Sequence, residues 1–128
     1  NISEDPVAAD PLAVADGSTI GGQDYVPADL IYRDRKGQTY SVTHGPGHRW
    51  CYFSGLRRDE AVLLKCFDSS EVPGLVRWTA HTGFSDPRTP PGAPLRESVD
   101  ARCIAFFEDG DATRTGLAAA ELFPDAVL

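Results

Sequence analysis

A histidine followed by an arginine and a serine gives the clearest chemical signal in this sequence. His81 lies fifteen residues before Arg96, and Ser98 follows that arginine with one residue between them. An imidazole nitrogen can bind a transition metal. Side chains two residues apart on a strand point to the same side. Arg96 can therefore grip a carboxylate through two parallel hydrogen bonds, and the Ser98 hydroxyl can add a third.

Each of these residues also has a plainer interpretation. An isolated histidine such as His81 is more often a structural residue whose hydrogen bonds are satisfied. Arg96 can form a surface ion pair with Glu97 or Asp100, which follow it closely. The residue types and spacing alone leave both interpretations open.

His44 and His48 are a second pair that invites a metal-binding interpretation. Their spacing of four would place both on one face of a helix, but residues 45–47 are Gly-Pro-Gly, which excludes a helix. We therefore expect ordinary loop histidines. Asp68 and Asp86 are expected to be turn and capping residues rather than ligands.

Composition and charge exclude several classes of protein. The chain has 128 residues, of which 41% are hydrophobic and 24% charged, as in a single globular domain. A net charge of -7 argues against a nucleic-acid surface. No apolar run approaches the roughly 18 residues that a membrane span needs. We therefore expect neither a nucleic acid nor a membrane as a partner.

The three cysteines indicate a reducing compartment. Cys51, Cys66 and Cys103 are odd in number, and their spacings match no zinc motif. Each stands among apolar or aromatic neighbours, so we expect free, buried thiols. This expectation places the protein in the cytoplasm.

Ten prolines and twelve glycines divide the chain into short pieces that mostly resemble strands. The segments expected to form strands are residues 29–33, 38–43, 49–53, 76–81 and 98–107, the first two being a hairpin around Lys36-Gly37. Helices are expected at 58–64 and 116–123, although residues 61–67 could equally form a strand. This arrangement favours a sandwich or jelly roll.

Four motifs in order resemble one known family. They are residues 10–16 (DPLAVAD), 48–53 (HRWCYF), 59–69 (DEAVLLKCFDS) and 81–98 (HTGFSDPRTPPGAPLRES). Together they resemble the Fe(II)/2-oxoglutarate-dependent oxygenases typified by the cephamycin 7-hydroxylation component and the fungal gibberellin-desaturase-like proteins. These act mostly in secondary metabolism. The resemblance covers about residues 10–107.

The resemblance implies a fold and a division of the chain. The expected fold is the C-terminal portion of a mainly β, double-stranded β-helix (a cupin-like jelly roll) with one or two short helices. Residues 1–10 would be a flexible segment, 11–108 the jelly-roll portion, and 109–128 a turn and helix.

The resemblance also implies a site for Fe(II) and 2-oxoglutarate. In such oxygenases two histidines and a carboxylate bind one face of the iron. His81 would be the last of these ligands, and Arg96 with Ser98 would hold the distal carboxylate of 2-oxoglutarate. Tyr52 and Lys65 are further candidates for that pocket, since Lys65 interrupts an apolar run and must either reach solvent or find a partner.

The other two iron ligands are missing from the sequence. None of its three histidines begins a His-x-Asp or His-x-Glu motif, which family members carry in an additional N-terminal half. We therefore expect a missing half, a second chain or a homo-oligomer to complete the barrel around a small-molecule substrate, which is hydroxylated or desaturated. The alternative is a non-catalytic jelly-roll subunit or small-molecule binding module.

Overall fold

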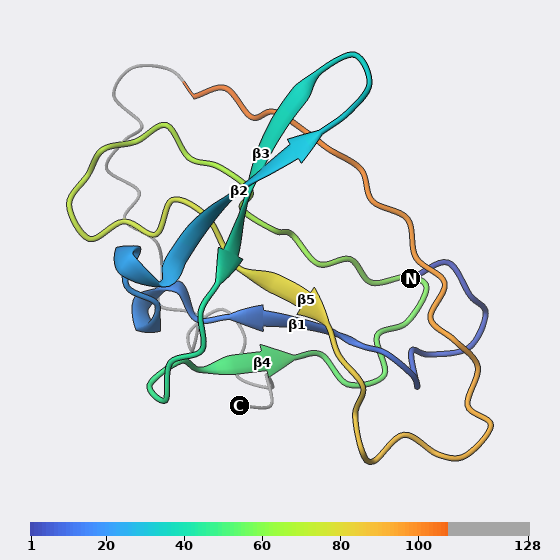
Figure 1. The fold of residues 1–128 in the computed structure, drawn as a ribbon. Coiled ribbons are helices and arrows are strands. Elements are labelled where there is room, and N and C mark those ends of the chain that lie inside the picture. The colour runs from blue at the N-terminus through green and yellow to red at the C-terminus, as the bar shows by residue number, and fades with distance from the viewer. Residues whose placement is uncertain (108–128) are drawn as a thin grey trace.

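The computed structural model describes residues 1–107, which are mainly β (Figure 1). The elements are β1 (Leu12–Ala15), η1 (Gly17–Thr19), η2 (Gly22–Asp24), β2 (Tyr25–Ile31), β3 (Lys36–Val42), β4 (Trp50–Tyr52) and β5 (His81–Gly83). The two η elements are short 3-10 helices, which the sequence analysis did not anticipate. The strands form one sheet of three and one of two, and no closed barrel is formed by the described residues.

β1 is the central strand of the three-stranded sheet. β4 pairs with one edge of β1 and β5 with the other, both antiparallel. Val14 lies opposite both Cys51 and His81, and Ala13 lies opposite both Tyr52 and Thr82. A four-residue strand thus brings together segments that are far apart in sequence.

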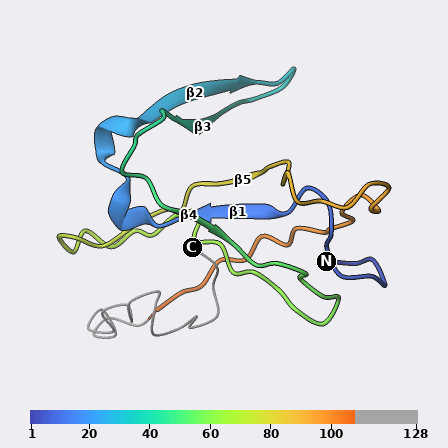
Figure 2. The same cartoon turned by 90° about the horizontal axis from the view of Figure 1, so that it is seen from below.

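β2 and β3 form the expected hairpin with slightly different bounds. Tyr32 N–H donates to the Arg35 carbonyl at 2.9 Å, so the turn lies at 32–35, and Lys36 and Gly37 belong to β3. Seen from below, the hairpin lies across one side of the three-stranded sheet (Figure 2). The Tyr40 ring stacks on Trp78 with 5.7 Å between ring centroids, which ties the hairpin to the segment before β5.

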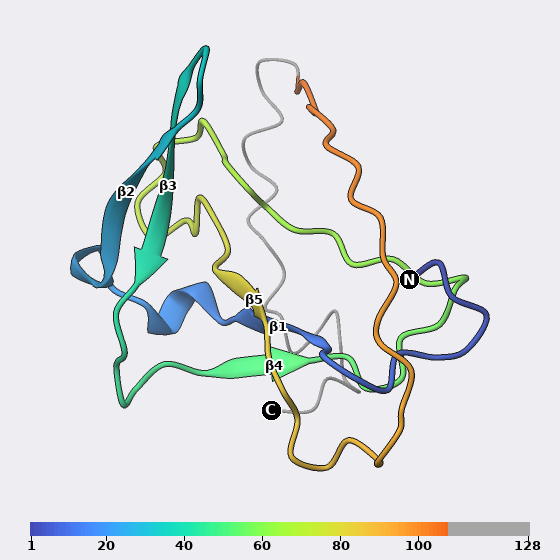
Figure 3. The ribbon, with the colours of Figure 1, turned by 45° about the vertical axis from the view of Figure 1, so that its right-hand side comes forward.

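Several expected elements do not form. Residues 53–80 and 84–107 contain no strand or helix, so the strands expected at 61–67 and 98–107, and the helix expected at 58–64, are wrong for this structure. Of the strand expected at 76–81, only His81 lies in a strand, which is β5. The last described segment runs along the outside in an extended path (Figures 1 and 3). Leu63 is 96% exposed and Phe106 is 90% exposed. These segments have strand-like sequences, but no neighbouring sheet buries their apolar side chains. The helix expected at 116–123 lies outside the described residues.

The core comes from the first twenty residues. Its buried apolar side chains are Val7, Ala9, Ala13, Ala15 and Ile20. Residues 1–10, expected to be flexible, are held by backbone hydrogen bonds from Val7 N–H to the Leu56 carbonyl and from Ile2 N–H to the Glu97 carbonyl, each 3.0 Å long. The N-terminal segment therefore packs against the rest of the described chain.

The cysteines are free, as expected, but they are not all buried. Cys51 is half-buried on β4, whereas Cys66 and Cys103 are exposed. Burial raises the pKa of the Cys51 thiol. The expectation of burial was wrong for Cys66 and Cys103 because the apolar segments that carry them do not join a sheet. No helix among the described residues is long and apolar enough to cross a membrane.

The loop after β5 is anchored by a network around Asp86. This carboxylate accepts a hydrogen bond from the Tyr52 hydroxyl at 2.9 Å and forms an ion pair with Arg88 at 3.0 Å. Its Oδ1 also accepts the Arg88 backbone N–H at 2.9 Å. Asp86 is therefore a turn residue, as expected from the sequence. The Arg88 guanidinium, with the Arg88 backbone N–H, lowers the pKa of the Asp86 carboxyl to about 2.

The lowered pKa predicts how Asp86 contributes to stability as pH changes. Because the pKa in the folded state is about 2 instead of the usual 3.8, the ionised carboxylate stabilises the fold above about pH 4 and loses this effect as pH falls towards 2. Asp86→Asn should lower the urea midpoint of unfolding at pH 7 and flatten its decline between pH 4 and 2. Asp34→Asn, at the exposed hairpin turn, is the control. An unchanged acid profile in Asp86→Asn would contradict the prediction.

Candidate functional site

His81 is positioned with one ring nitrogen available to a metal. It is the first residue of β5, its side chain is exposed, and Nδ1 lies 2.9 Å from the Thr79 carbonyl oxygen. A carbonyl oxygen only accepts hydrogen bonds, so Nδ1 must carry the proton. In the neutral ring this leaves the Nε2 lone pair free. A backbone carbonyl that sets the tautomer in this way is the usual support of a metal-binding histidine.

The sheet register places Gly83 on the same face as His81. The two residues are two apart on β5, and side chains alternate between the faces of a strand. A Cβ placed on Gly83 would lie 3.8 Å from Nη2 of Arg96. The Arg96 guanidinium therefore lies over the face of β5 to which His81 points. His81 and Arg96, the two strongest candidates from the sequence, are brought to one face.

Arg96 is held in place from two directions. Its Nε donates to the Asp10 carbonyl at 2.8 Å, and its Nη1 donates to the Ser98 hydroxyl at 2.8 Å. Among the described residues no hydrogen bond is made by Nη2. The Nη1 and Nη2 edge of the guanidinium thus retains donors for a carboxylate, with Ser98 beside it.

A guanidinium beside the strand that carries a metal-binding histidine suits a short dicarboxylate. Such a diacid can bind a metal with one end and hold its far carboxylate against the guanidinium. His81 Nε2 is a suitable donor for Fe(II), but it is one protein ligand of the three required. The described residues contain no group of three or more His, Cys, Asp or Glu that could hold a metal ion.

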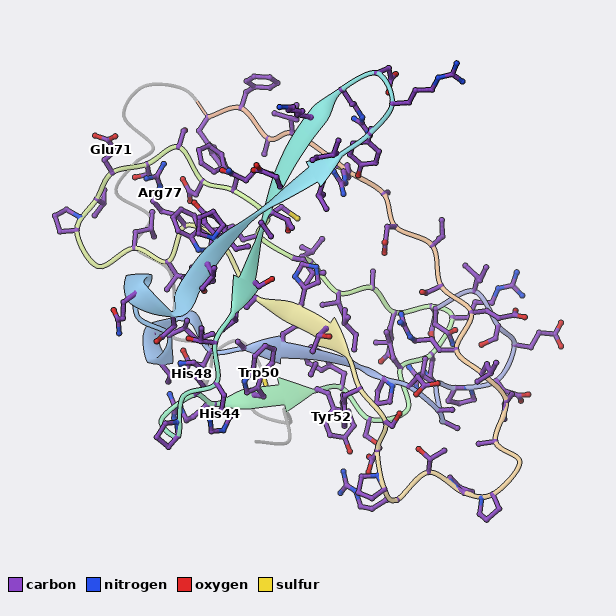
Figure 4. All side chains as sticks on the ribbon, viewed as in Figure 1. His44, His48, Trp50, Tyr52, Glu71 and Arg77 are labelled. Carbon is purple, nitrogen blue, oxygen red and sulfur yellow. The ribbon has the colours of Figure 1, made fainter. Side chains whose placement is uncertain are left out.

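Tyr52 is not brought together with His81 and Arg96. Tyr52 lies opposite Ala13, and His81 lies opposite Val14. Successive residues of β1 face opposite ways, so the two side chains occupy opposite faces of the sheet. Tyr52 lies at the far end of β4 (Figure 4), where its hydrogen bond to Asp86 raises the pKa of the phenol. Its contacts anchor the loop after β5.

Lys65 is also engaged elsewhere. Its side chain is 41% exposed, and its ammonium forms an ion pair of 2.8 Å with Asp68, which lowers the pKa of the Asp68 carboxyl. The Lys65 carbonyl accepts a hydrogen bond from Thr79 N–H at 2.8 Å. Its backbone thus runs beside the segment that leads to His81, while its side chain points to a local partner.

His44 and His48 behave as loop residues. Both lie near Trp50 at one end of the sheet (Figure 4), around a hollow of about 320 Å³. The His48 ring is 6% exposed and lies 3.1 Å from the Asp24 carboxylate, and it holds the pKa of that carboxyl below its usual value. A Cβ on Gly45 would lie only 2.5 Å from Nε2 of His48. Glycine is needed there so that the ring can fold over the backbone and reach Asp24.

Sequence reasoning missed two residues at this site, Asp10 and Gly83. Asp10 is the acceptor for Arg96 and has a positive φ of 47°. Gly83 provides the open surface beneath the guanidinium. The Asp-Pro pair before β1 and the glycine two residues after His81 were both visible in the sequence. Their roles depend on the pairing of β1 with β5, which no local pattern shows.

The sequence of this chain matches a known family and several named relatives. The family model described as "Oxidoreductase/YMDC permease-like domain" matches residues 2–106. Aspirochlorine biosynthesis protein N of Aspergillus oryzae is 43% identical over 108 residues, covering 81% of this chain and 44% of that protein. Hydroxylase/desaturase asaB of Aspergillus flavus is 39% identical over 117 residues, covering 81% of this chain and 52% of that protein.

A solved structure is similar as well. The iron and alpha-ketoglutarate-dependent endoperoxidase NvfI superposes with a TM-score of 0.63 at 34% sequence identity, covering 70% of this chain and 33% of that one. This chain spans about half, or less, of the length of these relatives. The resemblance to Fe(II)/2-oxoglutarate-dependent oxygenases, first indicated by four motifs, is confirmed by these matches. The chain belongs to the oxidoreductase/YMDC permease-like family, and its relatives include proteins named as hydroxylase/desaturases and as an Fe(II)/2-oxoglutarate-dependent dioxygenase.

Proposed function

We propose that this chain provides the co-substrate-binding part of an Fe(II)/2-oxoglutarate-dependent oxygenase of secondary metabolism. His81 would bind iron through Nε2, and Arg96 with Ser98 would hold the distal carboxylate of 2-oxoglutarate. The observation that supports this most is the face of β5 that His81 and Gly83 share, beside which the guanidinium of Arg96 lies. When bound, iron and 2-oxoglutarate supply the dioxygen chemistry that oxidises a substrate C–H bond.

The remaining residues of the site have defined tasks in this proposal. The Thr79 carbonyl orients the His81 ring and, in the neutral ring, favours the tautomer that leaves the Nε2 lone pair for the metal. The Ser98 hydroxyl, which accepts a hydrogen bond from Arg96, can donate its own proton to the bound carboxylate. Together they would bind and orient the co-substrate before the reaction begins.

The remaining iron ligands would come from polypeptide outside this chain. Its relatives are about twice as long or longer, and its sequence has no His-x-Asp or His-x-Glu. Large apolar side chains are also exposed along the later part of the described chain: Leu63, Phe67, Leu95, Val99, Ile104, Phe106 and Phe107. Burying each would contribute about 1.5–3 kcal/mol. We propose that further strands cover these residues and complete a double-stranded β-helix, from a missing half, a second chain or another copy.

The substrate and cellular location are part of the same proposal. Relatives named as hydroxylases, desaturases or an endoperoxidase support an oxidation reaction, and we propose a small, largely apolar metabolite as its substrate. The exposed free thiols of Cys66 and Cys103 support a reducing compartment such as the cytoplasm.

Metal and co-substrate binding test the assignment directly. In the protein expressed from its complete gene, His81→Ala should weaken Mn(II) binding by at least about tenfold because a ligand is lost. His44→Ala, at an exposed loop histidine, should leave Mn(II) binding unchanged.

Arg96→Lys keeps the charge but removes the planar guanidinium, and should weaken 2-oxoglutarate binding by about tenfold or more. Arg33→Lys is its control. Calorimetry gives both affinities, and wild-type values in both site variants would favour the non-catalytic binding module.

Gly83 tests where the distal carboxylate lies. Gly83→Ala places a methyl group in ordinary contact with Arg96, at 3.8 Å from Nη2, and should have little effect. Gly83→Leu fills the space between the strand and the guanidinium. It should weaken 2-oxoglutarate binding by about tenfold or more, as expected when overpacking costs about 1–3 kcal/mol, while Mn(II) binding is retained. Equal 2-oxoglutarate affinities in the two variants would contradict this location.

A further inference from the structure

Asp10 adopts a backbone conformation that its sequence context disfavours. Its φ of 47° makes it the only non-glycine residue with a positive φ among those described. It also precedes Pro11, and proline restricts the residue before it to extended conformations. Such a conformation persists only where surrounding contacts enforce it, and it is concentrated at functional sites.

The hydrogen bonds of Asp10 join it to Ser85, shortly after β5, and to Arg96. Its carbonyl oxygen accepts the Nε proton of Arg96 at 2.8 Å in a partly buried hydrogen bond. Its Oδ1 accepts the Ser85 hydroxyl at 3.3 Å. The next carbonyl, that of Pro11, accepts the Phe84 backbone N–H at 3.2 Å. The turn before β1 thus connects the exit of β5 with the arginine.

The direction of the Asp10 carbonyl follows from this turn. The chain bends at Asp10, where φ is positive, and the ring of Pro11 fixes the next φ near −65°. β1 then begins at Leu12, which lies opposite Gly83. The carbonyl is therefore held beside the position where the guanidinium lies over β5. The Asp10 carbonyl accepts the hydrogen bond from Nε of Arg96. The opposite edge of the guanidinium, with Nη1 and Nη2, then lies beside Gly83.

We propose that Asp10 is a positioning residue for the carboxylate-binding arginine, acting through its backbone carbonyl and the left-handed turn. This inference rests on the proposed function, because it concerns how Arg96 is presented to 2-oxoglutarate. A free arginine would lose side-chain entropy each time it bound the carboxylate. An arginine already held at Nε binds with a smaller loss. Asp10 would act on the co-substrate through Arg96 and not directly.

The test separates the backbone turn from the side chain of Asp10. Asp10→Gly and Asp10→Asn both tolerate a positive φ, so they should keep 2-oxoglutarate affinity close to that of the unaltered protein. Asp10→Val disfavours the turn and should weaken 2-oxoglutarate binding by about tenfold, the size of a lost hydrogen bond to a charged group. Ser85→Ala removes the partner of the Asp10 carboxylate and should have little effect. The protein expressed from its complete gene is titrated with 2-oxoglutarate in the presence of Mn(II), and with Mn(II) alone.

Three results would overturn the inference. Asp10→Val could bind 2-oxoglutarate normally while Arg96→Ala does not, in which case the arginine binds the co-substrate without help from Asp10. Asp10→Val could lose Mn(II) affinity and thermal stability together with 2-oxoglutarate affinity, which would show a purely structural role. If Arg96→Ala itself binds 2-oxoglutarate normally, the proposed function fails along with the inference. Selective loss in Asp10→Val with retention in Asp10→Gly supports it.

Discussion

The pairing of β1 with strands on both of its edges is the interaction on which the rest of the structure depends. Four residues, Leu12–Ala15, bring together β4 and β5. Their alternation decides which side chains share a face, so that His81 lies over one side and Tyr52 over the other. The turn at Asp10 comes directly before this strand and meets Arg96. Without β1 nothing in the described chain would bring the histidine and the arginine together.

The described residues form only a small apolar core, and this bears on whether the candidate site can be enclosed. Three of its five buried apolar side chains are alanines, Ala9, Ala13 and Ala15, which remove little surface from water. Several larger apolar side chains between residues 63 and 107, among them Leu63, Phe106 and Phe107, remain exposed. A site that binds iron and dioxygen must be enclosed to exclude water. The same added strands that would bury these side chains could also close the site, so stability and catalysis would depend on one completed barrel.

Local sequence patterns predicted the local features well. The hairpin, the short aromatic strand at Trp50–Tyr52 and the loop character of His44 and His48 are all present. The Gly-Pro-Gly argument succeeded because it depends only on backbone sterics. The strands expected at 61–67 and 98–107 did not form, because a strand is stabilised by a neighbour and not by its own residues. The apolar side chains of these segments would need a neighbouring sheet to bury them, and the described residues do not form one there.

The candidate site was predictable only where its residues form a local sequence pattern. The motif that joins His81 to Arg96 and Ser98 is contiguous in sequence, and the structure places the Arg96 guanidinium beside Gly83, on the face of β5 that His81 shares. Tyr52 and Lys65 are candidates from the sequence only by analogy with related pockets. The structure gives their side chains other partners, Asp86 and Asp68. Asp10 and Gly83 could not be found from local patterns, since their roles arise from long-range pairing and from an unusual backbone conformation.

A crystal structure of the protein expressed from its complete gene, with Mn(II) and 2-oxoglutarate bound in the absence of oxygen, tests the central claim most directly. The account predicts His81 Nε2 on the metal and the distal carboxylate between Arg96 and Ser98, above Gly83. It also predicts that the Asp10 carbonyl remains on Nε of Arg96. A metal bound without His81, or a co-substrate carboxylate held by other residues, would contradict the account.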